Sequence, residues 1–165
     1  MLKKIVIAAL FLVPFGVFAQ DKIACINTEE VYNAMPETAA AETELSKYSQ
    51  SISNELRRWE DEYNKKMAEF QQQSDTLVQS IKVRRMQELQ DIRERLTTYY
   101  EQSQQDFNNK QNELNAPIIQ KIQDAIKVVC EENGYTFVLE KRGLLYVAPN
   151  ATDATSLVKA KLGIR

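Results

Sequence analysis

Residues 21–37 read DKIACINTEEVYNAMPE, a stretch that begins as a β-strand and then changes character. Ile23, Cys25 and Ile26 favour strands, whereas Asn27 and Thr28 are typical of a helix start. An isolated strand is not stable in water, and about a hundred residues pass before another strand-like segment appears. The fold therefore depends on how this first strand reaches a partner far along the chain.

The residues ahead of the strand have the pattern of a secretory signal peptide over residues 1–19. Lys3 and Lys4 precede the apolar run IVIAALFLVPFGVF, and the residues that follow suit cleavage before Gln20. A membrane anchor is the alternative, but the run is shorter than the ~20 residues that span a bilayer and contains proline and glycine. A lipoprotein would use Cys25, which charged residues separate from the apolar run. We therefore expect an exported chain with a cleaved signal.

The composition of the mature chain argues against most enzyme classes. Removing the signal leaves 19 basic and 23 acidic residues, so no overall charge attracts the chain to nucleic acid or anionic lipid. The sequence has no histidine, the commonest metal ligand and general base, and no glycine-rich phosphate loop. Cys25 and Cys130 both fall on apolar patterns, so we expect buried free thiols, with a disulfide as the alternative. The sequence predicts no catalytic residue, no metal and no cofactor.

Residues 37–116 have the composition of long helices, with neither glycine nor proline between Pro36 and Pro117. Apolar residues recur at steps of three and four, which predicts coiled-coil packing rather than a cofactor site. The first stripe consists of Leu45, Tyr48, Ile52, Leu56, Trp59, Tyr63, Met67 and Phe70, and the second of Met86, Leu89, Ile92, Leu96, Tyr99, Ser103, Phe107, Lys110 and Leu114.

This helical segment is either one rod or a hairpin. A continuous rod would be about 120 Å long and would leave the first strand far from any partner. The stretch QQQSDTLVQ offers a turn, because Thr76 and Gln79 match the spacing of a capping box. We therefore expect an antiparallel helical-hairpin arm over 37–116 with its tip near 74–80.

Residues 117–165 are expected to complete a small body with residues 20–36, the first strand and a short helix. Pro117 is expected to open a new helix, with Asn115 as its cap, that ends at Asn133-Gly134. YTFVLE and LLYVA then read as a β-hairpin around residues 141–143, and a short helix capped by Thr152 or Asp153 closes the chain. The predicted fold is α+β: a small antiparallel β-body, made of the first strand and the C-terminal hairpin, that carries the arm.

This arrangement resembles the Skp (OmpH-like) family of periplasmic chaperones over the whole mature chain. The likeness is carried by DKIACINTEEVY, by the glycine-free arm, by PIIQKIQDAIKVVCEENGYTFVLE and by DATSLVKAKL, in that order. It implies a homotrimer whose arms surround a cavity that holds unfolded outer-membrane proteins in the periplasm. The family's best-studied members are markedly basic, whereas this mature chain is acidic. No lysine constellation supports a lipopolysaccharide site, and none is assigned.

The resemblance and the residue pattern together suggest three groups of functional residues. Arm residues that the seam leaves accessible are expected to contact unfolded proteins, with packing in the seam as the alternative; Tyr100 is the strongest candidate because Tyr99 already occupies the stripe. A basic cluster near the tip is expected either to make a weak contact with a membrane surface or acidic segments of a bound protein, or to be a solvated helix face. The arm candidates are Trp59, Tyr63, Met67, Phe70, Tyr99 and Tyr100; the basic cluster is Lys82, Arg84 and Arg85; the residues expected in the core or association surface of the body are Ile23, Cys25, Ile122, Ile126, Val129, Phe137, Leu139 and Tyr146.

The resulting prediction is a holdase chaperone, a protein that binds unfolded proteins and prevents their aggregation. A structural coiled-coil spacer or tether in the cell envelope is the alternative. The tether would bind one partner stably through its arm, whereas the chaperone would bind many unfolded proteins.

Overall fold

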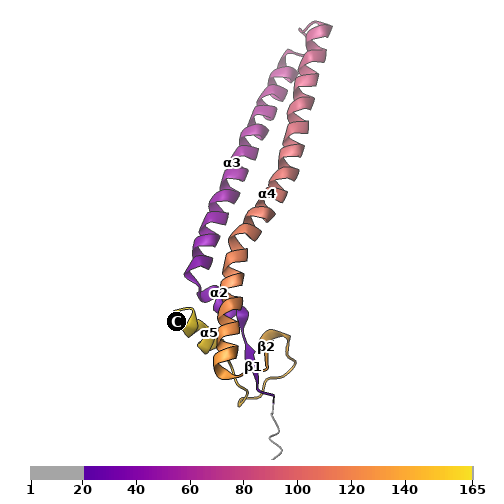
Figure 1. Ribbon diagram of the computed structural model, residues 1–165. Helices are drawn as coiled ribbons and strands as arrows, with labels where there is room; N and C mark the ends of the chain where they lie inside the picture. The colour runs from indigo at the N-terminus through magenta and orange to yellow at the C-terminus, as the bar shows by residue number, and fades with distance from the viewer. Residues whose placement is uncertain (1–20, 165) are drawn as a thin grey trace, which may run out of the picture.

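The computed structural model describes residues 21–164, and the predicted signal peptide, residues 1–19, lies outside this range (Figure 1). Two long helices run side by side away from a small base that holds the remaining elements (Figure 1). In chain order the elements are β1 (Ile23–Ile26), α2 (Thr28–Ala34), α3 (Pro36–Gln73), α4 (Gln79–Asn133), β2 (Phe137–Glu140), the 3-10 helix η1 (Lys141–Gly143) and α5 (Thr155–Lys161).

The arm is an antiparallel hairpin of α3 and the first two thirds of α4, joined by residues 74–78. Every residue of the first apolar stripe is half-buried, and Leu89, Ile92 and Ser103 of the second stripe are buried. The ion pair Lys110–Glu44, with 2.9 Å between Nζ and Oε1, joins the two helices. The predicted helical hairpin is therefore confirmed, and the continuous rod is excluded.

Two details of the helix boundaries differ from the prediction. α4 begins after the extended residue Val78 without a side-chain cap, because the Thr76 hydroxyl instead donates to the Gln73 carbonyl at the end of α3, at 2.9 Å. α4 also continues through Pro117, so the expected new helix does not start there. Asn115 is not a cap, since its Oδ1 accepts a hydrogen bond from the Tyr32 hydroxyl at 2.7 Å.

The sheet is parallel, so the predicted antiparallel body with a C-terminal hairpin was wrong. β1 pairs with β2 in the register Ile23 with Phe137 through Ile26 with Glu140. Parallel pairing suits two strands that a long helical connection separates. After β2 the chain turns away in η1, where Glu140 accepts from the Arg142 N–H, and residues 144–148 form no strand.

The segment before α5 forms backbone hydrogen bonds with the other edge of β1. The Cys25 N–H donates to the Thr152 carbonyl and the Cys25 carbonyl accepts from the Ala154 N–H, both at 2.8 Å. The N-cap of α5 is Ala154, not the predicted Thr152 or Asp153, and it makes no side-chain capping hydrogen bond. The Asp153 carboxylate nevertheless accepts from the Thr155 N–H at 2.9 Å, just before the first turn of α5. These contacts explain how the C-terminal segment joins the body without the predicted hairpin.

The core lies between the sheet and the helices of the base. α4 is followed by the C-cap residue Gly134, whose φ of 66° is a left-handed conformation that favours glycine, and the chain then enters β2. Both cysteines are free: Cys25 is buried and Cys130 is half-buried. The buried cluster contains Ala24, Ile26, Val31, Met35, Ala41, Ile118, Ile122, Ala125, Val129, Ala154 and Val158.

Candidate functional site

The outer face of the sheet, turned away from the helices, is apolar and exposed. Residues paired in register share a face, so Ile23 and Phe137 lie together there while Ala24 and Ile26 face the core. Ile23 is 51% exposed and Phe137 53% exposed. We call this surface the outer sheet face; it consists of Ile23, Phe137, Leu139, Leu144, Leu145 and Tyr146.

The segment after η1 extends this apolar surface. Leu145 and Tyr146 are strongly exposed, and a hollow of about 240 Å³ lies between this segment and Cys25 of β1. Monomeric soluble proteins rarely expose contiguous apolar patches of this kind, which usually mark an interaction site. Within residues 21–164, β2 also has a strand partner on one edge only, so its second edge offers unpaired backbone groups.

Polar contacts fix the segment that follows β2. Partial burial raises the pKa of the Asp153 carboxyl, but hydrogen bonds from Lys141 Nζ, at 2.8 Å, and from Thr155 outweigh it and hold this pKa at about 2. Burial likewise raises the pKa of Glu140, but the Thr28 hydroxyl and N–H bind its carboxylate and the net pKa is lowered. Glu140 therefore fastens the start of the segment to α2, and the Lys141–Asp153 pair joins the two ends of the 141–153 segment to each other.

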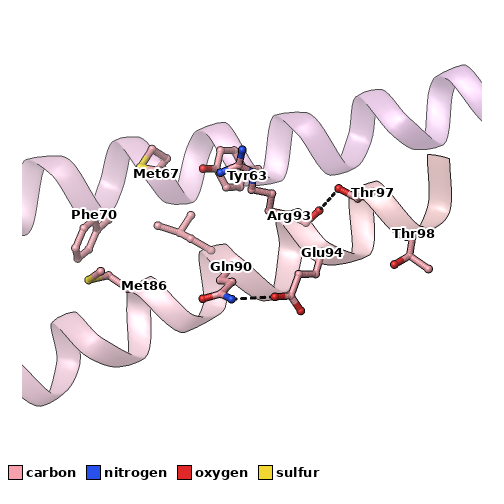
Figure 2. A pocket seen from close by; sticks show the side chains of 10 residues that line it. Tyr63, Met67, Phe70, Met86, Gln90, Arg93, Glu94, Thr97 and Thr98 are labelled. Atoms are coloured by element: carbon pink, nitrogen blue, oxygen red, sulfur yellow. Dashed lines mark hydrogen bonds between the residues drawn. The ribbon is translucent and has the colours of Figure 1, made fainter. Parts of the chain in front are cut away.

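The arm carries a groove of about 790 Å³ between its two helices (Figure 2). Tyr63, Met67 and Phe70 line it from α3, and Phe70 lies opposite Met86 of α4 (Figure 2). Thioether side chains are flexible and polarisable, and they adapt to irregular apolar partners. Arg93 and Glu94 stand at the polar side of the groove. The groove is thus suited to apolar side chains of varied shape.

The structure brings together only half of the arm candidates. Tyr63, Met67 and Phe70 share the groove, whereas Trp59, Tyr99 and Tyr100 lie outside it. Trp59 is half-buried, and its ring N–H donates to Glu55 at 2.8 Å. Tyr99 is half-buried in the seam, and Tyr100 is 55% exposed. Met86 and Leu89 of the groove were absent from the candidates, although their place in the second stripe was a signal for them.

The basic cluster lies in the first turns of α4 and is partly neutralised. Arg84 and Arg85 both form ion pairs with Glu88, at 3.4 and 3.5 Å, while Lys82 is half-buried. Exposed apolar residues stand among these charges. Val78, Ile81 and Val83 fall outside both apolar stripes, so the stripes gave no signal for them, whereas Met86 begins the second stripe.

The body candidates divide into two sets. Cys25, Ile122 and Val129 are buried, and Ile126 is half-buried against the core. The remaining four are not core residues but belong to the outer sheet face, where the sequence did not predict Leu144 or Leu145. These four are Ile23, Phe137, Leu139 and Tyr146.

Residues 21–164 contain neither a metal-binding cluster nor a membrane-spanning helix. Among residues 21–164, no group of three histidine, cysteine, aspartate or glutamate side chains is placed to hold a metal ion. In the same range, no helix combines the length and the apolar character needed to cross a membrane. The features that remain are the outer sheet face, the arm groove and the basic cluster.

Comparison with known proteins then decides the family. The profile of the family described as "Outer membrane protein (OmpH-like)" matches residues 22–162. The chain belongs to the OmpH-like family. The match covers nearly all of the described residues, body and arm alike, and confirms the resemblance that the sequence suggested.

Relatives of this OmpH-like chain include proteins named chaperone protein Skp. The one from Pectobacterium atrosepticum is 30% identical over 141 residues, 86% of this chain and 85% of the relative. The one from Photorhabdus laumondii is 30% identical over 162 residues, 96% of this chain and 98% of the relative. A crystal structure from Caulobacter crescentus, described as an OmpH-like outer membrane chaperone, superposes with a TM-score of 0.76 at 14% identity. It covers 87% of this chain and 85% of that one, and it supports the fold.

Proposed function

We propose that this OmpH-like chain is a periplasmic holdase chaperone that binds unfolded outer-membrane proteins and prevents their aggregation. The observation that carries the proposal is the match to chaperones named Skp over both body and arm. A partial match to the arm alone would have supported any coiled coil. The substrates, here called clients, are exported β-barrel proteins before they fold.

The arm supplies the client-binding surface in this proposal. Unfolded clients have no fixed shape, so the surface that holds them must accept many sequences. Flexible methionine side chains and half-exposed rings in the arm groove suit that task. Each contact is weak, and several contacts on one client act together through effective concentration. Tyr100 adds a further exposed ring outside the groove.

The outer sheet face supplies the association surface, and we propose a homotrimer. Its apolar residues are exposed in the single chain, and burying them between copies would remove this surface from water. Three copies joined at their bodies would place three arms around a common space, in which a client is held. The basic cluster near the tip would add a weak contact with acidic client segments or a membrane surface, reduced by the pairing with Glu88.

The test of the chaperone function is an aggregation assay with the mature full-length chain. An unfolded outer-membrane β-barrel protein is diluted from urea, and light scattering is followed with and without the chain. We expect the chain to keep the client soluble at near-stoichiometric amounts, and to do so for several unrelated barrels. Aggregation as rapid as in buffer alone would refute the proposal, and stable binding of a single partner would favour the tether.

The test of the association surface compares two exposed apolar residues. Phe137→Asp places a charge on the outer sheet face, and Val83→Asp places one at an equally exposed position near the tip. We expect the first to lower the mass measured by light scattering to that of a single chain, with no change in the helical signal. The second should leave the mass unchanged. An unchanged mass for Phe137→Asp would remove the outer sheet face as the association surface.

A further inference from the structure

The groove between the two arm helices has walls of different chemistry. On the α3 side, Tyr63, Met67 and Phe70 form an apolar wall, and all three are half-buried. The α4 wall begins with Met86 and the buried Leu89 and then becomes polar (Figure 2). The polar side chains of this wall, all exposed, are Gln90, Arg93, Glu94, Thr97 and Thr98. A ligand that fits both walls is therefore apolar on one side and polar on the other.

The length of the groove suits an extended chain. From Met86 to Thr97, α4 rises by about 16 Å at 1.5 Å per residue. An extended chain covers this length with about five residues, whose side chains point alternately to opposite sides. A helix is too wide, because it measures at least ~10 Å across its side chains and the axes of packed helices lie only ~8–10 Å apart. The groove thus fits a short extended segment whose apolar side chains face α3 and whose polar side chains face α4.

Arg93 gives the polar wall a preferred charge. Among residues 21–164 its guanidinium forms no ion pair, whereas Arg84 and Arg85, nearer the tip, are both paired with Glu88. The Glu94 carboxylate, by contrast, accepts a hydrogen bond from the Gln90 amide at 2.9 Å. Figure 2 shows the Arg93 side chain extending from α4 toward Tyr63. An arginine without an ionic partner binds carboxylates through charge-assisted, often bidentate hydrogen bonds.

We propose that the arm groove binds an extended client segment in which apolar and polar residues alternate, and that Arg93 selects segments with aspartate or glutamate at the polar positions. The inference rests on the proposed chaperone function, since it names the client segments that the arm recognises. Strands of membrane β-barrels alternate apolar and polar side chains and keep this pattern when unfolded, whereas a membrane-spanning helix is a continuous apolar run. The site lies within one arm, so it does not depend on the number of copies.

The test measures the binding of labelled peptides to the mature full-length chain by fluorescence anisotropy. Two peptides contain the same leucines and glutamates, either alternating or gathered into two blocks, and a third alternates leucine with glutamine. We expect the alternating acidic peptide to bind about tenfold more tightly than either of the others. Arg93→Gln should remove the preference for glutamate over glutamine and keep the preference for alternation. Arg95→Gln, at an exposed position of α4 outside the groove, should keep both preferences.

A photoreactive amino acid in place of Met67 locates the bound peptide. We expect it to crosslink to the alternating acidic peptide, whereas crosslinks to a second copy of the chain that exclude the peptide would make another arm the occupant and overturn the proposal. Equal affinity for alternating and blocked peptides would also overturn it, as would a preference for glutamate that survives Arg93→Gln. A chain that keeps whole β-barrel proteins soluble but does not discriminate between the peptides would overturn the groove alone. Failure in both assays would overturn the chaperone function as well.

Discussion

At the residue scale, Asp153 does most to fix the C-terminal segment against the sheet. Its carboxylate accepts hydrogen bonds from Lys141, at the far end of the segment, and from Thr155 at the start of α5. Its backbone lies beside Cys25 of β1. The backbone and side chain of this one residue therefore join strand, segment and helix, and a pKa of about 2 for its carboxyl means that the folded state favours the charged form.

Replacing this residue should make stability depend on pH in a defined way. The folded-state pKa is about 2, below the ordinary 3.8, so the charged carboxylate stabilises the fold above pH 3.8, and this contribution is lost progressively as the pH falls from 3.8 through 2. We expect Asp153→Asn to lower the free energy of unfolding at pH 7 by about 1 kcal/mol, since solvent screens a partly exposed pair. In urea unfolding curves the difference from the parent chain should be much smaller at pH 2 and should vanish below it.

The control for this prediction is Asp61→Asn, a change to an exposed carboxylate on α3. Its free energy of unfolding should equal that of the parent chain at every pH between 7 and 2. A destabilisation by Asp153→Asn that persists undiminished at pH 2 would mean that the shape of the side chain matters and its charge does not.

At the element scale, the arm followed from local pattern and the sheet did not. The apolar stripes, whose residues recur every three or four positions, correctly placed the seam. Residues close in sequence, such as Leu89 and Ile92, determine which face of a helix is apolar and is buried. The strand residues of β1 and β2 were also recognised from their composition. Their parallel pairing depends on where a 55-residue helix ends, which no local pattern encodes.

Two other predictions at this scale were wrong because a local pattern fits more than one structure. The sequence predicts a helix start at Pro117 because proline is common in the first turn of a helix. Pro117 instead lies inside α4, where its exposed ring is accommodated at the cost of one helical hydrogen bond. Residues 144–148 have strand composition, but η1 directs them away from the sheet of their own chain. The groove of the candidate site was half predicted: Tyr63, Met67 and Phe70 were among the candidates, whereas Met86 and Leu89 were placed only in the second stripe.

The hairpin can be tested by crosslinking. Leu56 of α3 and Leu96 of α4 are both half-buried in the seam. Cysteines at these two positions, in a Cys25→Ser, Cys130→Ser background, should form a disulfide within one chain, detected as a shift in denaturing electrophoresis without reductant. Cysteines at 56 and 76 should not, because they lie about 30 Å apart along the arm. Failure of the 56/96 pair and of its neighbouring registers would contradict the antiparallel seam.

At the scale of the whole molecule, we expect the body to be more sensitive than the arm to single substitutions. Ile122 is 5% exposed in the core of the body, where an aspartate would be a buried unpaired charge that costs several kcal/mol. We expect Ile122→Asp to abolish both association and client protection, while the arm keeps much of its helical signal in circular dichroism. Tyr100→Ser, at a 55% exposed arm position, should leave client protection nearly unchanged because each arm contact is weak. An Ile122→Asp chain that is monomeric yet protects clients would show that the arm acts alone.

The central claim is that several arms, joined through their bodies, hold one unfolded client between them. Native mass spectrometry of the mature full-length chain tests it most directly, first alone and then after an unfolded outer-membrane β-barrel protein is diluted from urea into it. The account predicts three copies in the first spectrum and three copies with one client in the second. A single chain in the first spectrum, together with one chain bound to each soluble client in the second, would contradict it.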